Sequence, residues 1–278
     1  MFSFKDLIKN KNRPLVMGIL NITPDSFSDG GEAFTVEDAL EKLKILCNEG
    51  ADVIDVGACS TAPGNVIVSE EEEIRRLNEF LPVVMKCSRV PVSVDTLRPG
   101  VARFCLEQGV QIVNDESGDF NTDMAQCVKD YGCGWVFMHT GGKTSAESND
   151  YCNGVVSDVL GFFAEMRNKA LDFSISKEQL CFDTGFGFSK KYEDNIELLS
   201  NMEWLKFKGI ALLSASSRKR FIGTASGVEN SSQRDAGTVA AHTAAIAGGA
   251  DIIRVHDVFS AVQGARVADA IYRGKTNG

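Results

Sequence analysis

The sequence lacks the features that mark several common classes of protein. Its 29 Lys and Arg residues are outnumbered by 38 Asp and Glu and form no basic tract, so we expect no nucleic-acid or anionic-membrane surface. No stretch comes near the roughly 20 apolar residues that a membrane span needs. The first thirteen residues mix apolar and basic side chains and lack the apolar core of a secretory signal. These absences predict a soluble, cytoplasmic protein.

Two missing motifs exclude further classes. The eight cysteines include no C-x-x-C pair, and none lies at a spacing from histidine that is typical of zinc sites. We therefore interpret most of them as small apolar residues in a reducing cytosol. A G-x-G-x-x-G turn is absent after the first apolar run, which argues against a dinucleotide-binding fold. Because the formal net charge is −9, an anionic substrate would need a local basic cluster.

What the sequence does contain is a regular alternation of short apolar runs and longer amphipathic segments. The runs predicted as buried strands are 15–20, 53–57, 92–96, 110–115, 135–139, 180–183, 210–213 and 252–256. Predicted helices cover 35–50, a segment starting at 69, 99–109, 122–131, 155–173, 192–205, 239–248 and 258–272. Eight strand–helix units predict an α/β protein, a single-domain (β/α)8 TIM barrel over residues 1–278, with a doubly wound open sheet as the alternative.

Helix starts are marked by capping residues. Thr35 with Asp38 resembles a capping box, and Gly50 is a typical helix end. Ser69 with Glu72 marks another start. The acidic run 70–73 suits the positive end of that helix dipole, so we interpret it as a solvated first turn rather than a metal site.

Polar side chains stand at the end of each predicted strand, where barrel enzymes place their active sites. They are Asn21, Asp55, Asp95, Asn114, Asp115, His139, Asp183, Lys219 in the seventh loop, Arg254 and His256. Asp95, Asn114 and Asp183 could hydrogen-bond a flat heterocycle, and are also compatible with a metal. Arg254 and His256 suit a phosphate. Asn21 could ligate Mg²⁺ carried by a diphosphate, because Mg²⁺ takes few protein ligands. Together they indicate a phosphorylated heterocyclic substrate.

Several long motifs resemble one family, the dihydropteroate synthases, which have a pterin-binding TIM barrel. The first is Asn21-Ile-Thr-Pro-Asp-Ser-Phe-Ser-Asp-Gly-Gly31. The others are Ser93-Val-Asp95-Thr, Asn114-Asp115, Met138-His139, Asp183-Thr-Gly-Phe-Gly-Phe-Ser-Lys190, Ser217-Arg-Lys219 and Arg254-Val-His256-Asp257. They occur in the family's order over nearly the whole chain.

The resemblance implies a transferase of folate biosynthesis. It would join 4-aminobenzoate to (7,8-dihydropterin-6-yl)methyl diphosphate, through a pterin methylene cation, and would be a sulfonamide target. The residues implied for the pterin are Asp95, Asn114, Met138, Asp183, Phe188 and Lys219, and for the Mg²⁺-diphosphate Asn21 (also the metal ligand), Arg254 and His256.

The same resemblance implies the remaining contacts. Those for aminobenzoate are Thr61, Pro63, Phe188 and Arg220, and Asp29 joins Asp95, Asp183, Lys219 and Arg254 as catalytic. Phe27 and Asp29 would lie on a loop that closes over the site. A homodimer through the late helices is also implied.

The second loop departs from the family. Cys59 stands where a Glu is usual, and Ala62 where an Arg is usual. Either Arg220, at a position where Ser is common, or some other basic residue supplies the missing charge, or the chain is a catalytically weak pterin-binding paralogue. A corrinoid-linked methyltetrahydrofolate methyltransferase domain is a further alternative. The first-loop motif and the Arg254/His256 pair argue against it, because methylfolate carries no diphosphate.

Overall fold

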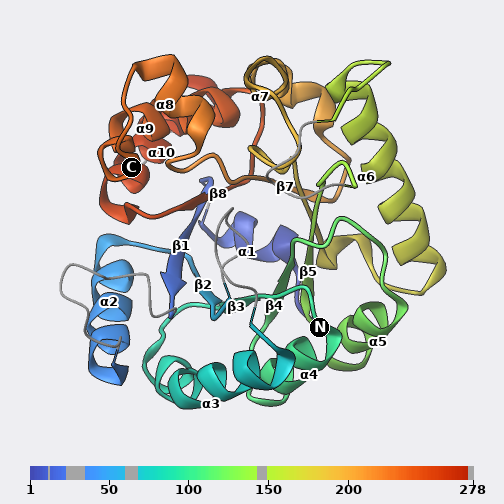
Figure 1. Ribbon diagram of the computed structural model, residues 1–278, viewed down its shortest axis with the longest axis vertical. Helices are drawn as coiled ribbons and strands as arrows, with labels where there is room; N and C mark the ends of the chain where they lie inside the picture. Colours follow the sequence, from blue (N-terminus) through green and yellow to red (C-terminus); the bar gives the residue numbers. More distant parts are fainter. Residues whose placement is uncertain (12, 23–34, 60–67, 143–148, 275–278) are drawn as a thin grey trace.

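Eight parallel strands close into a barrel in the computed structural model, which describes residues 1–11, 13–22, 35–59, 68–142 and 149–274. Each strand pairs with the next along the chain, and β8 pairs with β1 (Figure 1). The strands are β1 Leu15–Asn21, β2 Val53–Gly57, β3 Val92–Asp95, β4 Ile112–Asp115, β5 Gly134–Met138, β6 Leu180–Asp183, β7 Ala211–Ser214 and β8 Ile252–Val255. The predicted (β/α)8 barrel is confirmed, and the open sheet is excluded.

Helices follow the strands and surround the barrel (Figure 1). They are α1 Phe4–Lys11, α2 Val36–Glu49, α3 Glu70–Cys87, α4 Pro99–Glu107, α5 Thr122–Tyr131, α6 Val155–Asp172, α7 Tyr192–Ser200, α8 Arg220–Ser226, α9 Asp235–Ala247 and α10 Val258–Tyr272. The sequence pattern does not predict α1, and the helix predicted at 239–248 begins earlier, at Asp235 in α9. The predicted helix 192–205 is wrong in its second half, because Asn201 separates α7 from a short 3-10 helix, η3 (Met202–Leu205).

The ends of α2 follow from its capping residues. Thr35 Oγ1 accepts a hydrogen bond from the Asp38 N–H, and the Asp38 carboxylate accepts one from the Thr35 N–H, which completes the predicted capping box. Gly50 ends the helix with φ of 101°, a left-handed conformation that favours glycine.

The acidic start of α3 differs from expectation at one position. Ser69 caps the helix by accepting a hydrogen bond from the Glu72 N–H, as predicted. Glu73, however, is buried rather than solvated, and it pairs with the Arg98 guanidinium. Arg98 also donates to the Val68 carbonyl at 2.6 Å, so this pair ties the start of α3 to the loop after β3.

Two apolar layers hold the fold together. The larger one lies between the outer faces of the strands and the helices. The smaller one fills the barrel interior and consists of Phe4, Leu15, Met17, Val53, Ile112, Val136, Cys181, Ala211, Leu213, Ala215 and Ile252.

Helix α1 closes one end of the barrel. Its Phe4 is 1% exposed within the inner layer, and burial of such a side chain stabilises the fold by about 2–3 kcal/mol. Phe2 N–H donates to the Gly132 carbonyl just before β5, which places α1 where the strands begin. The opposite end, where the strands finish, is therefore the end at which a site can form.

None of the described helices combines the length and apolar character that a transmembrane span requires.

Candidate active site

Arg254 is the centre of a buried charge cluster at the carboxyl ends of the strands. From β8 its Nε donates to Asp55 Oδ2 at 2.6 Å, and its Nη2 donates to Asp95 Oδ2 at 2.5 Å. Glu116 Oε1, in the loop after β4, lies 4.0 Å from Arg254 Nη1. Burial disfavours the charged guanidinium, but the three carboxylates outweigh it and raise the pKa of Arg254. The guanidinium is therefore a permanent cation that crosses the end of the barrel from β8 to β2 and β3.

Asn114 extends the cluster onto β4. Its Nδ2 donates to Asp55 Oδ2 at 3.1 Å, so Asp55 accepts hydrogen bonds from both Asn114 and Arg254. Asn114 Oδ1 has no partner among the described residues. The sequence places Asp55 at the end of a predicted strand, but Asp55 is not among the residues predicted to bind a substrate.

Asp95 and Asp183, the two carboxylates predicted to bind the pterin, are largely shielded from water. Burial and nearby Glu116 raise the pKa of Asp95 well above its usual range, although Arg254 opposes the shift. Burial also raises the pKa of Asp183 to about 6, while a hydrogen bond from the Gly185 N–H to Asp183 Oδ1 at 2.8 Å opposes it. Such carboxylates gain most when a substrate brings a cation or N–H donors, because water stabilises their charge so poorly.

Lys219 and Phe188 form the wall opposite β3. Lys219 Nζ lies 4.3 Å from the centroid of the Phe188 ring, a cation–π distance. Burial lowers the pKa of Lys219, and the charges of Glu116, Asp183 and Asp95 favour its charged form. Gly187 has φ of 80°, and a β-carbon there would come within 3.2 Å of Lys219 Cδ, so glycine lets this loop pass close to the Lys219 side chain.

Lys190, the last residue of the motif that starts at Asp183, fixes the loop that carries Phe188. Its Nζ donates to the carbonyls of His139, Gly185 and Phe188 at 3.1, 3.0 and 3.0 Å. All three ammonium protons are thereby used within the protein. Burial lowers the pKa of Lys190 to about 7.

Asn21 lies on the opposite side of the barrel mouth. In the strand register Asn21 is level with Gly57, and Gly57 is level with Asp95. A β-carbon on Gly57 would come within 3.2 Å of Asn21 Oδ1 and 3.7 Å of Asp95 Cβ. Glycine at this position on β2 therefore leaves room for the side chains of Asn21 on β1 and Asp95 on β3. The structure thus brings Asn21 beside the predicted pterin carboxylate.

His256, at the end of β8, contacts Ser217 in the loop after β7. Ser217 Oγ lies 2.9 Å from His256 Nδ1 and accepts a hydrogen bond from the His256 backbone N–H at 3.2 Å. Burial lowers the pKa of His256 to about 3, with the cations of Arg218, Arg254 and Lys219 acting in the same direction. His256 is therefore neutral near pH 7, unlike Arg254.

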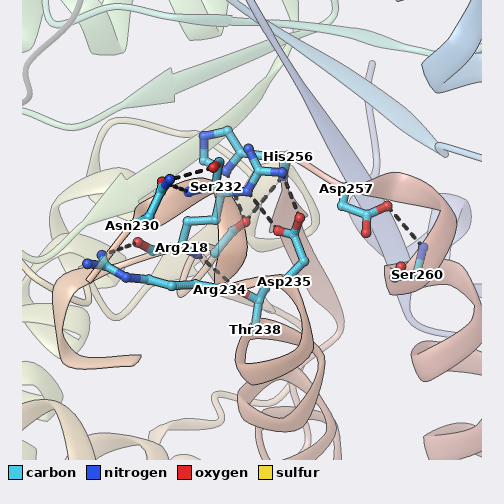
Figure 2. A network of polar contacts seen from close by, with 10 residues as sticks. Arg218, Asn230, Ser232, Arg234, Asp235, Thr238, His256, Asp257 and Ser260 are labelled. Carbon is cyan, nitrogen blue, oxygen red and sulfur yellow. Dashed lines mark hydrogen bonds and ion pairs between the residues drawn. The ribbon is translucent and has the colours of Figure 1, made fainter. Parts of the chain in front are cut away.

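The loop that carries Ser217 and Lys219 is fastened from outside the site. Arg218 has φ of 58°, which costs about 1–2 kcal/mol for a residue with a side chain. Its guanidinium pairs with Asp235 through two hydrogen bonds of 2.7 and 2.8 Å, and its N–H donates to Thr238. Arg234 Nη1 donates to the Arg218 carbonyl at 3.0 Å. Figure 2 shows these side chains gathered beside His256.

The remaining predicted residues fall into two sets. Asp29, Phe27, Thr61, Ala62 and Pro63 lie outside the described residues. Arg220 is the first residue of α8 and is exposed; its guanidinium makes no hydrogen bond or ion pair with other described residues. Met138 is buried at the end of β5.

Glu116, Lys190 and Ser217 were not predicted as site residues. Ser217 and Lys190 stood inside recognised motifs, so position in a motif was the available signal. For Glu116 only its place after Asp115 at a strand end pointed to the site.

Known proteins have the same fold and similar sequences. Residues 17–256 match the pterin-binding enzyme family. The dihydropteroate synthase of Synechocystis sp. is 39% identical over 264 residues, which is 94% of this chain and 91% of that protein. The dihydropteroate synthase of Xanthomonas albilineans, solved with 4-aminobenzoic acid, aligns with a TM-score of 0.87 at 40% identity, covering 94% of this chain and 93% of that one. Its complex with 7,8-dihydropteroate aligns with a TM-score of 0.84 at 38% identity, covering 94% of each chain.

Fold and site together define a pterin-binding enzyme built on a (β/α)8 barrel. Within that class, the identity over nearly the whole chain places the protein among the dihydropteroate synthases, transferases of folate biosynthesis.

Proposed function

We propose that this chain condenses 4-aminobenzoate with (7,8-dihydropterin-6-yl)methyl diphosphate to give 7,8-dihydropteroate and diphosphate. The observation that carries this proposal is the buried cluster in which Arg254 bridges Asp55 and Asp95. One substrate must present cationic or N–H character to the carboxylates and negative charge to the guanidinium. A pterin that carries a diphosphate meets both requirements. The relatives solved with 4-aminobenzoic acid and with 7,8-dihydropteroate support the choice of substrate and product.

The pterin ring would lie between Asp95, Asn114 and Asp183 on one side and Lys219 on the other. Departure of diphosphate leaves positive charge on the pterin methylene that spreads into the ring. Asp95 and Asp183, with pKa values raised by burial, stabilise that charge strongly because little water competes with them. Met138 and Phe188 supply walls rather than chemistry. The arylamine then attacks the methylene and loses its proton afterwards.

The diphosphate would lie against Arg254, His256 and Asn21. Arg254 contributes a fixed positive charge, and neutral His256 contributes a hydrogen-bond donor. Because both groups bind the negative charge that grows as the C–O bond breaks, they favour departure of the leaving group.

Mg²⁺ fits the Asn21 side of the site. In the described part of the chain no three His, Cys, Asp or Glu side chains gather to hold a metal ion. A bound cation would therefore take few protein ligands and rely on substrate oxygens, which is the coordination that Mg²⁺ favours. Asn21 Oδ1, beside Gly57, is the oxygen that would hold it. When bound, Mg²⁺ would neutralise charge on the diphosphate.

The aminobenzoate would bind between Phe188 and the start of α8. Arg220 offers a cation for its carboxylate, at a helix end where anions are already favoured. This cation would compensate for Ala62. Thr61, Pro63 and Asp29 are proposed for the same side, and sulfonamides, which mimic aminobenzoate, would compete there.

Helix α10 offers a surface for a homodimer. Phe259, Val267 and Ile271 are 60%, 60% and 64% exposed, and Val267 and Ile271, which are four residues apart, form an exposed apolar stripe on one face of the helix. A second copy of α10 would cover this stripe. Cytoplasmic location stays a prediction.

Diphosphate release tests the proposed function. Release should require 4-aminobenzoate, the pterin diphosphate and Mg²⁺ together, and a sulfonamide should block it in competition with 4-aminobenzoate. Pterin binding by calorimetry without turnover, at any Mg²⁺ concentration, would instead identify a pterin-binding paralogue.

A further inference from the structure

The Ser217 hydroxyl joins two strand ends at the diphosphate side of the site. Its Oγ contacts both His256 Nδ1, at 2.9 Å, and the His256 backbone N–H, at 3.2 Å. Ser217 is buried, so bulk water does not compete for these contacts. The next residue, Arg218, is fixed by its ion pair with Asp235 and by the hydrogen bond from Arg234 to its carbonyl (Figure 2). These contacts also fix the direction of the Ser217 side chain.

The number of available protons decides whether Ser217 or His256 donates the hydrogen bond between Ser217 Oγ and His256 Nδ1. A serine hydroxyl has one proton and two lone pairs. The His256 backbone N–H can only donate, so it occupies one lone pair. If Nδ1 also donated, the hydroxyl proton would have no acceptor among the described residues, which is costly in a buried place. If the hydroxyl donates to Nδ1, every group is satisfied. Nδ1 is then an acceptor, and the single imidazole proton lies on Nε2.

We propose that Ser217 is a positioning residue that holds His256 as the neutral tautomer protonated on Nε2, so that this N–H donates to the diphosphate of the substrate. The proposal rests on the assignment of His256 to the diphosphate made above. In the opposite tautomer Nε2 would turn a lone pair toward an anion, which is repulsive. His256 Nε2 has no partner among the described residues, and this agrees with a donor that waits for a ligand.

The charges around His256 favour the same state. The cations that face it are Arg218, Arg254, Lys219 and Lys42, and together with burial they lower the pKa of His256 to about 3. A second proton is therefore excluded from the ring at neutral pH. With the ring neutral, the Ser217 hydroxyl alone decides which nitrogen keeps the proton.

Nitrogen NMR of the imidazoles tests the proposal without substrate. The chain has three histidines, so ¹⁵N-histidine labelling gives three ring systems, and His256→Gln identifies the one that matters. We expect an unprotonated Nδ1 and a protonated Nε2 for His256 at pH 7 in the wild type. In Ser217→Ala the two shifts should move toward values averaged over both tautomers. A proton on Nδ1 in the wild type, or an unchanged signature in Ser217→Ala, would overturn the proposal.

Kinetics separates this proposal from the proposed function. Ser217→Ala should raise KM for the pterin diphosphate about tenfold and leave KM for 4-aminobenzoate within twofold, because one charge-assisted hydrogen bond is weakened. Ser217→Thr keeps the hydroxyl and should restore both the tautomer and KM. Ser216→Ala is the matched control, since Ser216 is a neighbouring buried serine whose hydroxyl has no partner in the described structure. A shifted tautomer with unchanged KM would support the role of Ser217 and contradict the diphosphate assignment of His256.

Discussion

Asp95 and Arg254 pair in a buried place, and without Asp95 the guanidinium would keep only Asp55 and Glu116 as nearby carboxylates. Asp95→Ala should therefore lower affinity for the pterin by about 100-fold or more, because it removes an acceptor for the ring and leaves Arg254 with one fewer carboxylate. Calorimetry with a pterin that lacks the diphosphate measures this loss directly. The exposed carboxylate of Asp119, changed to Asn, serves as the control. Wild-type affinity in Asp95→Ala would show that the pterin binds elsewhere.

We predict that Asp183 makes pterin binding at the proposed site depend on pH. Its carboxylate must be ionised to accept hydrogen bonds from the ring, and burial raises its pKa to about 6. As pH falls through 6 a proton competes with the pterin, so affinity should fall up to tenfold per pH unit below that value and stay constant above it. The alcohol form of the pterin substrate avoids titration of the diphosphate itself.

The Asp183→Asn variant assigns that titration. It should bind more weakly and show no inflection near pH 6. Burial also raises the pKa of Asp115 to about 6, but Asp115 accepts hydrogen bonds from Ser117 and Trp135. An inflection that persists in Asp183→Asn would show that another buried carboxylate, Asp95 or Asp115, titrates in this range instead.

We predict that recognition of 4-aminobenzoate depends on Arg220, because position 62 is Ala rather than Arg. Arg220→Ser should raise KM for 4-aminobenzoate about tenfold, through the loss of one charge-assisted hydrogen bond, with little change in KM for the pterin diphosphate. Arg266→Ser, an exposed change on α10, is the control. Ala62→Arg should raise turnover with 4-aminobenzoate. An unchanged KM in Arg220→Ser would mean that α8 does not receive the carboxylate.

The loop between β6 and α7 depends on one buried lysine. Lys190→Met keeps most of the side-chain volume but leaves the carbonyls of His139, Gly185 and Phe188 without their donor. We expect a loss of about 3 kcal/mol in the free energy of unfolding, measured with denaturant, together with weaker pterin binding because Phe188 no longer supports Lys219.

The neighbouring lysine provides the matched control. Lys191 is exposed and pairs with the exposed carboxylate of Asp150, so Lys191→Met should stay close to the wild type in both stability and binding. Equal losses in the two variants would contradict a special role for the Lys190 contacts.

Strands and most helices could be predicted from periodicity and capping residues, whereas α1 could not. A helix of eight residues with only Phe4 buried has too weak a pattern, and its role becomes visible only when Phe4 reaches the barrel interior. Likewise the acidic run at the start of α3 is typical of a solvated turn. Only the packing of Arg98 shows why Glu73 is buried. Local pattern predicted the start of α3, but not its contact with a distant segment.

The residues of the candidate site could likewise be predicted, but their contacts with one another could not. Closure of the barrel implies that strand ends meet, so Asp95, Asn114, Asp183 and Arg254 could be predicted as one site. That Arg254 pairs with Asp55, 199 residues away in sequence, required coordinates. Sequence also gave no reason to expect His256 to be neutral, because that depends on burial and on nearby cations.

The exposed stripe on α10 predicts how whole molecules associate. Ile271→Glu, or the double change with Val267→Glu, should convert a dimer to a monomer in sedimentation experiments, since a charge would be buried in the contact. Arg266→Glu, beside the stripe, is the control. A wild-type protein that sediments as a monomer at micromolar concentration would contradict the proposed dimer.

The central claim is that the strand ends form a pterin well and a diphosphate well that share Arg254. A crystal structure with the pterin diphosphate and Mg²⁺ tests it most directly. We predict the ring edge against Asp95, Asn114 and Asp183, and the diphosphate within hydrogen-bond distance of Arg254 and His256, with Asn21 on the metal. Density for the ring away from these three side chains, or a diphosphate that contacts neither Arg254 nor His256, would contradict the account.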